Sequence, residues 1–391
     1  MTVRFPNKGV NVTRRGSLAL CAGTIATLAT PAHAEEGLVD AAAIDAMALE
    51  ALAANGSPGL QIAISIAGAP VFSRSYGAAN LETGAQVGNG SIFRIASLTK
   101  TFTAAAIYRL AEAGVLGIDD PVSRWLPSFS ALAPLSLHEL MTQTAGLHSD
   151  EDEGAVSGGP VSQTELADRI ARQAEPFDFA PGSAWLYSNA NYIVLGAVIE
   201  IATGKPYAEA MQTLIFGPLS LGSTAVDRMS EVVTGRVSGY ALSQTEPFVF
   251  ENAPNLPVEQ AGGAGSIRST AGDLCAWGQA LLSNRLLSPT SLANMTSPGR
   301  LRDGRLGGEN RFSPDDAAYG DVQYASGLLI SPPSEPLVSL LHYGGIDGFC
   351  SMLEIWPAHE VTLAILCNAD RNAATPFRSI RRYMTSRLSD L

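Results

Sequence analysis

Residues 97–113 read S-L-T-K-T-F-T-A-A-A-I-Y-R-L-A-E-A and are followed by Gly114. Alanine, leucine and lysine favour helices, and a glycine after the last apolar residue is a common helix end, so this stretch predicts one helix. Ser97 and Lys100 are three residues apart at its start, which places both side chains on one face, one turn apart. The unpaired N–H groups and the dipole at a helix N-terminus favour an oxyanion. The stretch permits two interpretations: a nucleophilic serine beside a lysine, or an N-capping serine and a surface lysine, which the stretch taken alone favours.

The count of lysines supports the first interpretation. The whole chain has only three lysines, Lys8, Lys100 and Lys205, whereas arginine is used at most positive positions. A base must be able to release its proton, which arginine does not do in proteins. The apolar residues after Lys100 can bury it, and burial lowers the pKa of a lysine toward neutrality. We therefore expect Lys100 to be the base that activates Ser97.

Two further motifs follow in the chain. Tyr187-Ser188-Asn189 comes shortly after Pro181-Gly182, and His342-Tyr343-Gly344-Gly345 lies near a late apolar run. These elements, in this order with S-x-x-K, resemble the serine β-lactamase and penicillin-binding protein superfamily. Neighbouring stretches at 140–147, 192–204 and 265–274 also look like this family, and the resemblance covers about residues 40–385. The residues within these motifs are most similar to those of D-alanyl-D-alanine carboxypeptidases and family VIII-type esterases.

The resemblance implies a role for each matching residue. Ser97 would be acylated, and Lys100, alone or with Tyr187, would accept its proton. Tyr187 would pass a proton to the leaving group and help to activate water. Asn189 would bind the acyl side chain of the substrate, as His342 and Gly344 would bind its other end. The backbone N–H groups of Ser97 and Gly345 would form the oxyanion hole.

The chain departs from the common family pattern at two positions. His342 stands where a lysine is usual, and a histidine is mostly neutral at pH 7, so it supplies a hydrogen bond in place of a fixed positive charge. This disfavours efficient β-lactamase activity. Gln143 replaces a frequent histidine in L-M-T-Q-T-A-G-L, and we interpret it as structural.

We expect an α/β (α+β) fold. A helix is predicted at 37–54, strands at 60–67 and 71–79 around a Gly68-Ala69-Pro70 turn, later strands at 323–330, 336–342, 349–356 and 361–368, and a last helix at 376–389. Strands at both ends predict one antiparallel sheet built from the N- and C-terminal segments and flanked by helices. The sheet lobe would span about 37–90 and 320–391, with a mostly helical lobe inserted at about 91–319 and a ligand cleft between them.

The N-terminus has the order of a secretory signal peptide. Four basic residues precede an apolar run at 18–28, and Ala32-His33-Ala34 offers a cleavage site, so residues 1–34 would be removed on export and 35–391 would form the hydrolase domain. The apolar run is too short to span a bilayer. The formal charge of −12 would become about −16, which disfavours nucleic acid and anionic lipid as partners. The expected partner is a small-molecule, peptide or ester substrate, without cofactor or metal; the oligomeric state stays open.

Three cysteines follow the signal peptide. Cys275, Cys350 and Cys367 are interpreted as buried apolar residues. Cys350 and Cys367 flank a predicted turn at equal distances, so they could also face one another across a hairpin and form a disulfide after export.

The predicted function is a secreted serine hydrolase with D-alanyl-D-alanine carboxypeptidase-like or esterase activity on small acyl or peptide substrates. A class C-like β-lactamase and a non-catalytic penicillin-binding sensor or scaffold are the alternatives. A scaffold would usually have lost the serine or the lysine, and both are present here.

Overall fold

The computed structural model describes residues 37–54, 56–149, 162–246, 248–254, 257–314, 321–370 and 375–391. The predicted signal peptide and nearly all of the predicted acidic loop at 149–160 lie outside these residues. Residues from Leu38 onward form one compact unit. No described helix is long and apolar enough to cross a membrane.

The helices of the described chain are α1 (Ala41–Ala53), α2 (Thr99–Glu112), α3 (Leu137–Met141), α4 (Gln163–Ala171), α5 (Asn189–Thr203), α6 (Tyr207–Met211), α7 (Gly217–Leu219), α8 (Gly262–Gly265), α9 (Ala271–Leu282), α10 (Pro289–Met295) and α11 (Phe377–Ser389). The strands are β1 (Gly59–Ile66), β2 (Ala69–Asn80), β3 (Ala85–Gln86), β4 (Phe93–Arg94), β5 (Ala225–Val226), β6 (Tyr240–Leu242), β7 (Phe250–Asn252), β8 (Ile267–Ser269), β9 (Gln323–Tyr324), β10 (Leu329–Ile330), β11 (Leu340–Ile346), β12 (Phe349–Trp356) and β13 (Val361–Cys367).

One large sheet joins the two ends of the chain, which confirms the predicted fold class. Its eight strands run in the order β3-β2-β1-β13-β12-β11-β10-β9, and the neighbouring strands are antiparallel. The N-terminal strand β1 pairs directly with the C-terminal strand β13, from Leu60 opposite Cys367 to Ile66 opposite Val361. Small sheets of β4-β8-β5 and β6-β7 accompany the helices of the central segment, where mainly helices and loops were expected.

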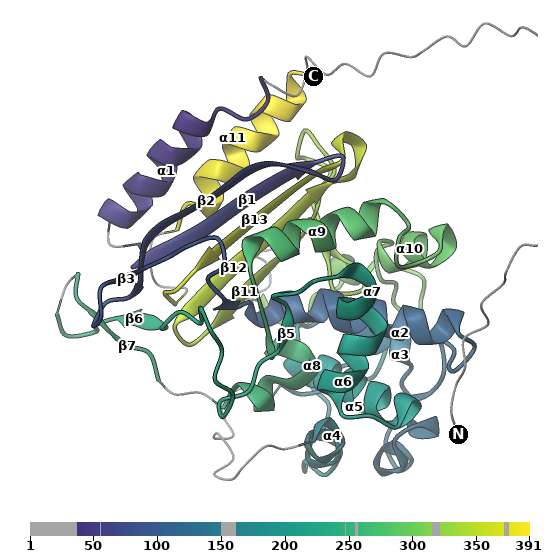
Figure 1. Ribbon diagram of the computed structural model, residues 1–391. Helices are drawn as coiled ribbons and strands as arrows, with labels where there is room; N and C mark the ends of the chain where they lie inside the picture. The colour runs from purple at the N-terminus through teal and green to yellow at the C-terminus, as the bar shows by residue number, and fades with distance from the viewer. Residues whose placement is uncertain are drawn as a thin grey trace, which may run out of the picture. The chain divides into compact units, whose positions relative to one another are not determined.

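Both faces of the central strands are covered, so these strands are apolar at successive positions rather than at alternate ones. Ile62 and Ile64 pack with α1 and α11 on one face, whereas Ala63 between them packs into the core shared with the helical segment. Figure 1 shows α1 and α11 on one side of the sheet and α9 on the other. Every residue of β1, β12 and β13 is buried.

Several predicted boundaries were wrong for local reasons. The first helix begins at Ala41, since the Asp40 side chain accepts the N–H of Ala42 at 2.9 Å and caps the helix. The turn between β1 and β2 is Ala67-Gly68, both with positive φ, as a two-residue hairpin requires; Ala69 and Pro70 already belong to β2.

Two late strands also differ from the prediction. The expected strand at 323–330 is split into β9 and β10, because the chain turns at Gly327 with φ +79°. The strand expected at 336–342 is β11, which extends from Leu340 to Ile346. His342-Tyr343-Gly344-Gly345 therefore lies within a strand and also precedes β12, the late strand expected at 349–356.

The cysteines are buried, and two of them face one another across a hairpin, as the sequence analysis allowed. Cys350 on β12 is directly opposite Cys367 on β13, and both are buried. Cys275 is buried on α9, and all three are free thiols. Burial raises the pKa of the Cys367 thiol.

Candidate active site

Ser97 lies in a single 3₁₀ turn, Ala96–Leu98, immediately before α2. Ala96 has φ +48°, a left-handed conformation that costs about 1 kcal/mol or more for a residue with a Cβ. Ile95 is fixed on both sides: its N–H donates to Ile267 O at 3.0 Å, and its carbonyl accepts the Ser351 hydroxyl at 2.8 Å. The strained turn is thus held by a neighbouring sheet strand and presents a half-buried Ser97 at the helix start.

Lys100 is fully buried on the first turn of α2 and contacts three acceptors. Its Nζ lies 3.0 Å from Ser97 Oγ, 2.7 Å from Asn189 Oδ1 and 2.9 Å from the main-chain oxygen of Ala264. The amide and carbonyl oxygens only accept, whereas the serine hydroxyl can accept or donate. A neutral amine can therefore receive the Ser97 proton while it donates to the other two oxygens, and an ammonium can donate to all three. Both protonation states are hydrogen-bonded in one geometry.

The second motif enters the site from the start of α5. Asn189 is the first residue of that helix, and its backbone N–H donates to Ser149 Oγ at 3.2 Å. The half-buried Tyr187 places its ring 4.8 Å from Lys100 Nζ. The structure thus brings Ser97, Lys100, Tyr187 and Asn189 together from the first turns of α2 and α5 and the residues just before them.

His342 on β11 is buried next to Tyr187, with the ring centroids 6.1 Å apart. Its Nδ1 lies 2.6 Å from the Tyr343 carbonyl, which can only accept, so Nδ1 carries the proton. Nε2 then accepts the hydroxyl of Tyr324 at 3.2 Å. Burial, and secondarily the charge of Lys100, lowers the pKa of His342 from 6.5 to about 3. The imidazole is therefore neutral at physiological pH.

Gly344 and Gly345 lie on the same strand. A Cβ at Gly344 would overlap the Ile95 carbonyl and the Ser351 hydroxyl. The close approach of β11 to the serine turn, the 3₁₀ turn Ala96–Leu98 that carries Ser97, therefore requires glycine there. Strand β10 pairs only with Leu340 and Leu341 of β11, so this pairing ends before Gly345. The half-buried Gly345 thus lies beyond the paired part of this strand edge.

Three partners of these residues were missed from the sequence. The Ala264 carbonyl belongs to the glycine-rich run at 262–265, where a Cβ at Gly263 would meet the Tyr192 carbonyl. The spacing of its glycines gives no sign of a lysine acceptor. Tyr324 and Gln143 reach the site through long-range contacts that also leave no local pattern.

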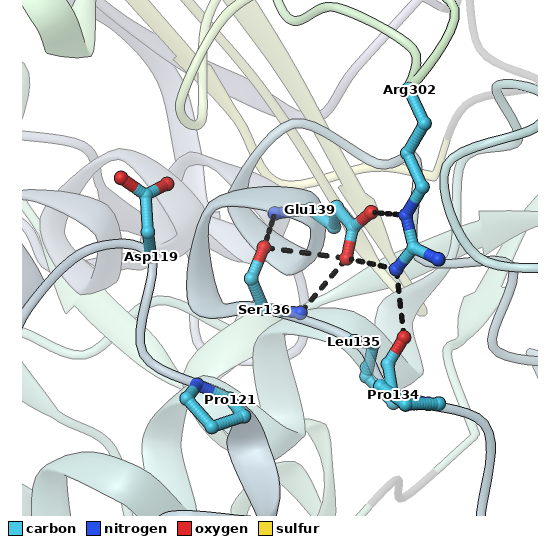
Figure 2. A pocket seen from close by; sticks show the side chains of 7 residues that line it. All are labelled: Asp119, Pro121, Pro134, Leu135, Ser136, Glu139 and Arg302. Atoms are coloured by element: carbon cyan, nitrogen blue, oxygen red, sulfur yellow. Dashed lines mark hydrogen bonds and ion pairs between the residues drawn. The ribbon is translucent and has the colours of Figure 1, made fainter.

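A separate pocket of about 300 Å³ opens at the N-terminus of α3. Figure 2 shows the capping box of Ser136 and Glu139, and Arg302 donating to both carboxylate oxygens of Glu139. None of the predicted site residues lines this pocket, and its arginine is already paired. Among the described residues, no group of three His, Cys, Asp or Glu side chains could hold a metal ion.

Known proteins are similar to this chain in sequence and in fold. The family model described as Beta-lactamase matches residues 43–383. Penicillin-binding protein 4* of Bacillus subtilis is 29% identical over 320 residues, which are 77% of this chain and 66% of that protein. Esterase EstB of Burkholderia gladioli is 33% identical over 261 residues, 62% of this chain and 65% of that protein. The chain thus spans just under two thirds of the length of these curated relatives.

A solved structure extends the comparison over almost the whole fold. The D-stereospecific amidohydrolase from Streptomyces sp. superposes with a TM-score of 0.72 at 28% identity, covering 88% of this chain and 98% of that one.

Proposed function

Because this chain belongs to the beta-lactamase family, we propose that it is a serine hydrolase that forms an acyl-enzyme on Ser97. The observation that carries the proposal is the 3.0 Å contact between Ser97 Oγ and the Nζ of a fully buried Lys100, which also contacts the oxygens of Asn189 and Ala264. A nucleophile within hydrogen-bond reach of a base that is itself held by further groups is the arrangement that nucleophilic catalysis needs.

The reaction would proceed in two balanced steps. Ser97 Oγ transfers its proton to Lys100 and attacks the carbonyl carbon, and the resulting oxyanion is bound by the N–H groups of Ser97 and Gly345. The bond to the leaving group then breaks, and that group takes the proton from Lys100 through Tyr187. A water molecule next gives a proton through Tyr187 to Lys100 and attacks the acyl-enzyme; the bond to Ser97 Oγ breaks, Lys100 returns the proton to that oxygen, and the acid is released.

The substrates we propose are esters and amides of small or D-amino-acyl groups. Support comes from the relatives: one is named an esterase, one a penicillin-binding protein and one a D-stereospecific amidohydrolase. As the family resemblance implies, Asn189 would bind the acyl side chain of the substrate from its place beside Lys100. Acyl transfer from an ester or an amide uses the same residues.

Efficient β-lactamase activity is the weaker candidate. The carboxylate of a β-lactam would be bound best by a fixed positive charge where His342 lies. His342 is neutral and already uses both ring nitrogens, on Tyr324 and on the Tyr343 carbonyl. We expect slow turnover of penicillins compared with activated esters.

We further propose that the protein is exported and cleaved near Ala34, on the basis of the basic, apolar and small-residue order of residues 1–34. Intact mass of the protein recovered from its native host tests this, because cleavage leaves a chain beginning at Glu35.

The substrate proposal is tested by comparing turnover of p-nitrophenyl acetate, D-alanyl-p-nitroanilide and L-alanyl-p-nitroanilide. We expect turnover of the ester and a preference for the D-anilide over the L-anilide, both abolished by Ser97→Ala. Turnover that survives Ser97→Ala contradicts the acyl-enzyme, and a preference for the L-anilide contradicts the proposed substrate class.

A further inference from the structure

Gln143 has an unusual conformation next to the proposed site. It lies in the turn after α3, its side chain is 0% exposed, and its φ of +63° is in the left-handed region. A residue with a Cβ is strained there. Its Nε2 is buried and has no hydrogen-bond partner among the described residues, which also costs free energy. The sequence led us to interpret this residue as structural, but both features reduce stability.

The contacts of Gln143 surround Tyr187. The backbone N–H of Leu186 donates to the main-chain oxygen of Gln143 at 3.1 Å. The backbone N–H of Ser188 donates to its side-chain Oε1, also at 3.1 Å. One buried residue therefore holds the main chain immediately before and immediately after Tyr187.

The same side chain also reaches the first turn of α5. Asn191 Nδ2 donates to Gln143 Oε1 at 2.5 Å, so that oxygen accepts two hydrogen bonds, one from the Tyr187 segment and one from the helix that carries Asn189. The next residue continues the pairing, because the Gly182 N–H donates to Thr144 O at 2.8 Å. An oxygen at this reach is specific to glutamine and glutamate; asparagine is one methylene shorter.

We propose that Gln143 is the positioning residue for Tyr187: through its main-chain oxygen and Oε1 it fixes residues 186 and 188, so that the half-buried tyrosine ring stays beside Lys100. This rests on the proposed function, in which Tyr187 transfers protons to the leaving group and from water. Gln143 touches neither the substrate nor the reacting atoms, so it acts only through Tyr187 and the start of α5.

The chain offers a matched control. Gln61 is also buried, at 2% exposed, and also bridges two main-chain segments: its Oε1 accepts the Ala271 N–H at 2.7 Å and its Nε2 donates to the Gly88 carbonyl at 2.7 Å. It has no place in the proposed machinery. Gln61→Asn should therefore lower the thermal stability without changing kcat of the folded enzyme.

The kinetic test uses full-length protein and p-nitrophenyl acetate. Gln143→Gly removes the side chain and relieves the left-handed strain, and Gln143→Asn keeps an amide that is too short. We expect both to lower kcat about tenfold to a hundredfold, because Tyr187 is no longer held where it passes on the proton of water during hydrolysis of the acyl-enzyme, and KM falls together with kcat. Gln143→Glu keeps an acceptor oxygen at full reach and should restore kcat to within about threefold of wild type.

Combining Gln143→Gly with Tyr187→Phe shows whether the fall in kcat is transmitted through Tyr187. If Gln143 acts through Tyr187, the double variant Gln143→Gly with Tyr187→Phe has the same kcat as Tyr187→Phe alone. Additive losses, or a loss of kcat in Gln61→Asn as large as in Gln143→Asn, would overturn the proposal.

Crystal structures of wild type, Gln143→Gly and Gln61→Asn separate this proposal from the proposed function. We expect residues 186–188 to move or to become less ordered only in Gln143→Gly. If the wild type hydrolyses no ester, the proposed function fails. The structural difference still tests whether Gln143 positions Tyr187. If the position and order of Tyr187 are unchanged in Gln143→Gly, Gln143 is not its positioning residue, whatever the activity.

Discussion

Lys100 is the residue on which the proposed chemistry depends. It is buried among α2, α5 and the 262–265 turn, where a permanent cation would be costly unless every N–H were paired. Three oxygens surround its Nζ, and one of them is a hydroxyl that can reverse its direction of donation. This environment stabilises the lysine in both protonation states, which a base that receives and returns one proton per acyl transfer requires.

Replacement of Lys100 should therefore remove activity even when charge is kept. We expect Lys100→Arg to lower kcat/KM for p-nitrophenyl acetate by about a thousandfold or more, because arginine cannot accept the serine proton and its planar fork does not fit the three oxygens. Lys205→Arg is the matched control: its exposed Nζ donates to Thr213, and kcat should be unchanged. Substantial activity in Lys100→Arg would show that another group is the base.

The burial of His342 leads to a prediction about the pH dependence of stability rather than about the rate of catalysis. Its pKa is about 3 in the folded chain and near 6.5 when unfolded, so between these values the unfolded chain binds more protons and the free energy of unfolding falls as the pH falls. Above pH 6.5 this contribution is fully present, and it amounts to a few kcal/mol at most, roughly 1.4 kcal/mol per pKa unit.

Urea unfolding at intervals from pH 7 to pH 4 measures this contribution. Compared with the wild type, His342→Asn should lose less stability over that range, although it is less stable at pH 7. Parallel pH dependences in the two proteins would contradict a buried neutral His342.

At the scale of elements, β11 and the turn before α2 form the site only because they pack very closely. Gly344 faces the Ile95 carbonyl and the Ser351 hydroxyl, whose mutual hydrogen bond ties β12 to the serine turn. The oxyanion donors proposed for Ser97 and Gly345 come from these two elements. Their spacing is therefore set by the close contact of Gly344 with the Ile95 carbonyl and the Ser351 hydroxyl.

Gly344→Ala should consequently disturb both folding and catalysis. We expect a loss of about 1–3 kcal/mol of stability from overpacking, and a fall of kcat about a hundredfold as the two elements separate. Gly90→Ala is the control, because a Cβ there meets no atom within 4 Å. Thermal unfolding and ester turnover measure both effects; a fully active Gly344→Ala would show that the close packing is not required.

The same elements show what sequence reasoning could and could not predict. The apolar runs of β1, β12 and β13 and the helix after Ser97 were found nearly at their true boundaries, because each satisfies a local pattern. Strand β11 was placed too early, since glycine is depleted in strands and Gly344-Gly345 ended the predicted run. Yet Gly344 is required by a contact with Ile95, about 250 positions away in the chain.

The site was predicted to a similar degree. Spacing together with the scarcity of lysine indicated Ser97 with Lys100, and the family resemblance added Tyr187, Asn189 and His342, which the structure brings to one place. The Ala264 carbonyl, Tyr324 and Gln143 were missed because each joins the site through folding of distant segments. A main-chain oxygen in particular has no residue type that could mark it.

At the scale of the whole molecule, the two ends of the chain complete one sheet. Strand β1 lies between β2 and the C-terminal β13, and α1 and α11 cover the same outer face (Figure 1). The core on that face includes Ile380, Met384 and Leu388 of the last helix. The strand β12 that follows the β11 glycines is thus packed against the last helix on the face away from the helical segment.

Truncation of the outer core should destabilise the protein without changing the chemistry of its folded fraction. We expect Met384→Ala to lower the free energy of unfolding by about 2–5 kcal/mol, as for other buried large-to-small changes, and to leave kcat of the folded enzyme unchanged. The exposed Ser386→Ala on the same helix should change neither. A fully stable Met384→Ala would show that α11 contributes little to the core.

The central claim is that Ser97 becomes acylated during turnover. Intact-mass spectrometry of protein quenched in acid during turnover of p-nitrophenyl acetate, followed by peptide mapping, tests it most directly, because an activated leaving group makes acylation fast relative to hydrolysis of the acyl-enzyme. We predict a mass increase of one acyl group, located on Ser97 and absent from Ser97→Ala. Turnover with no adduct on Ser97 at any quench time, or an adduct on another residue, would contradict the account.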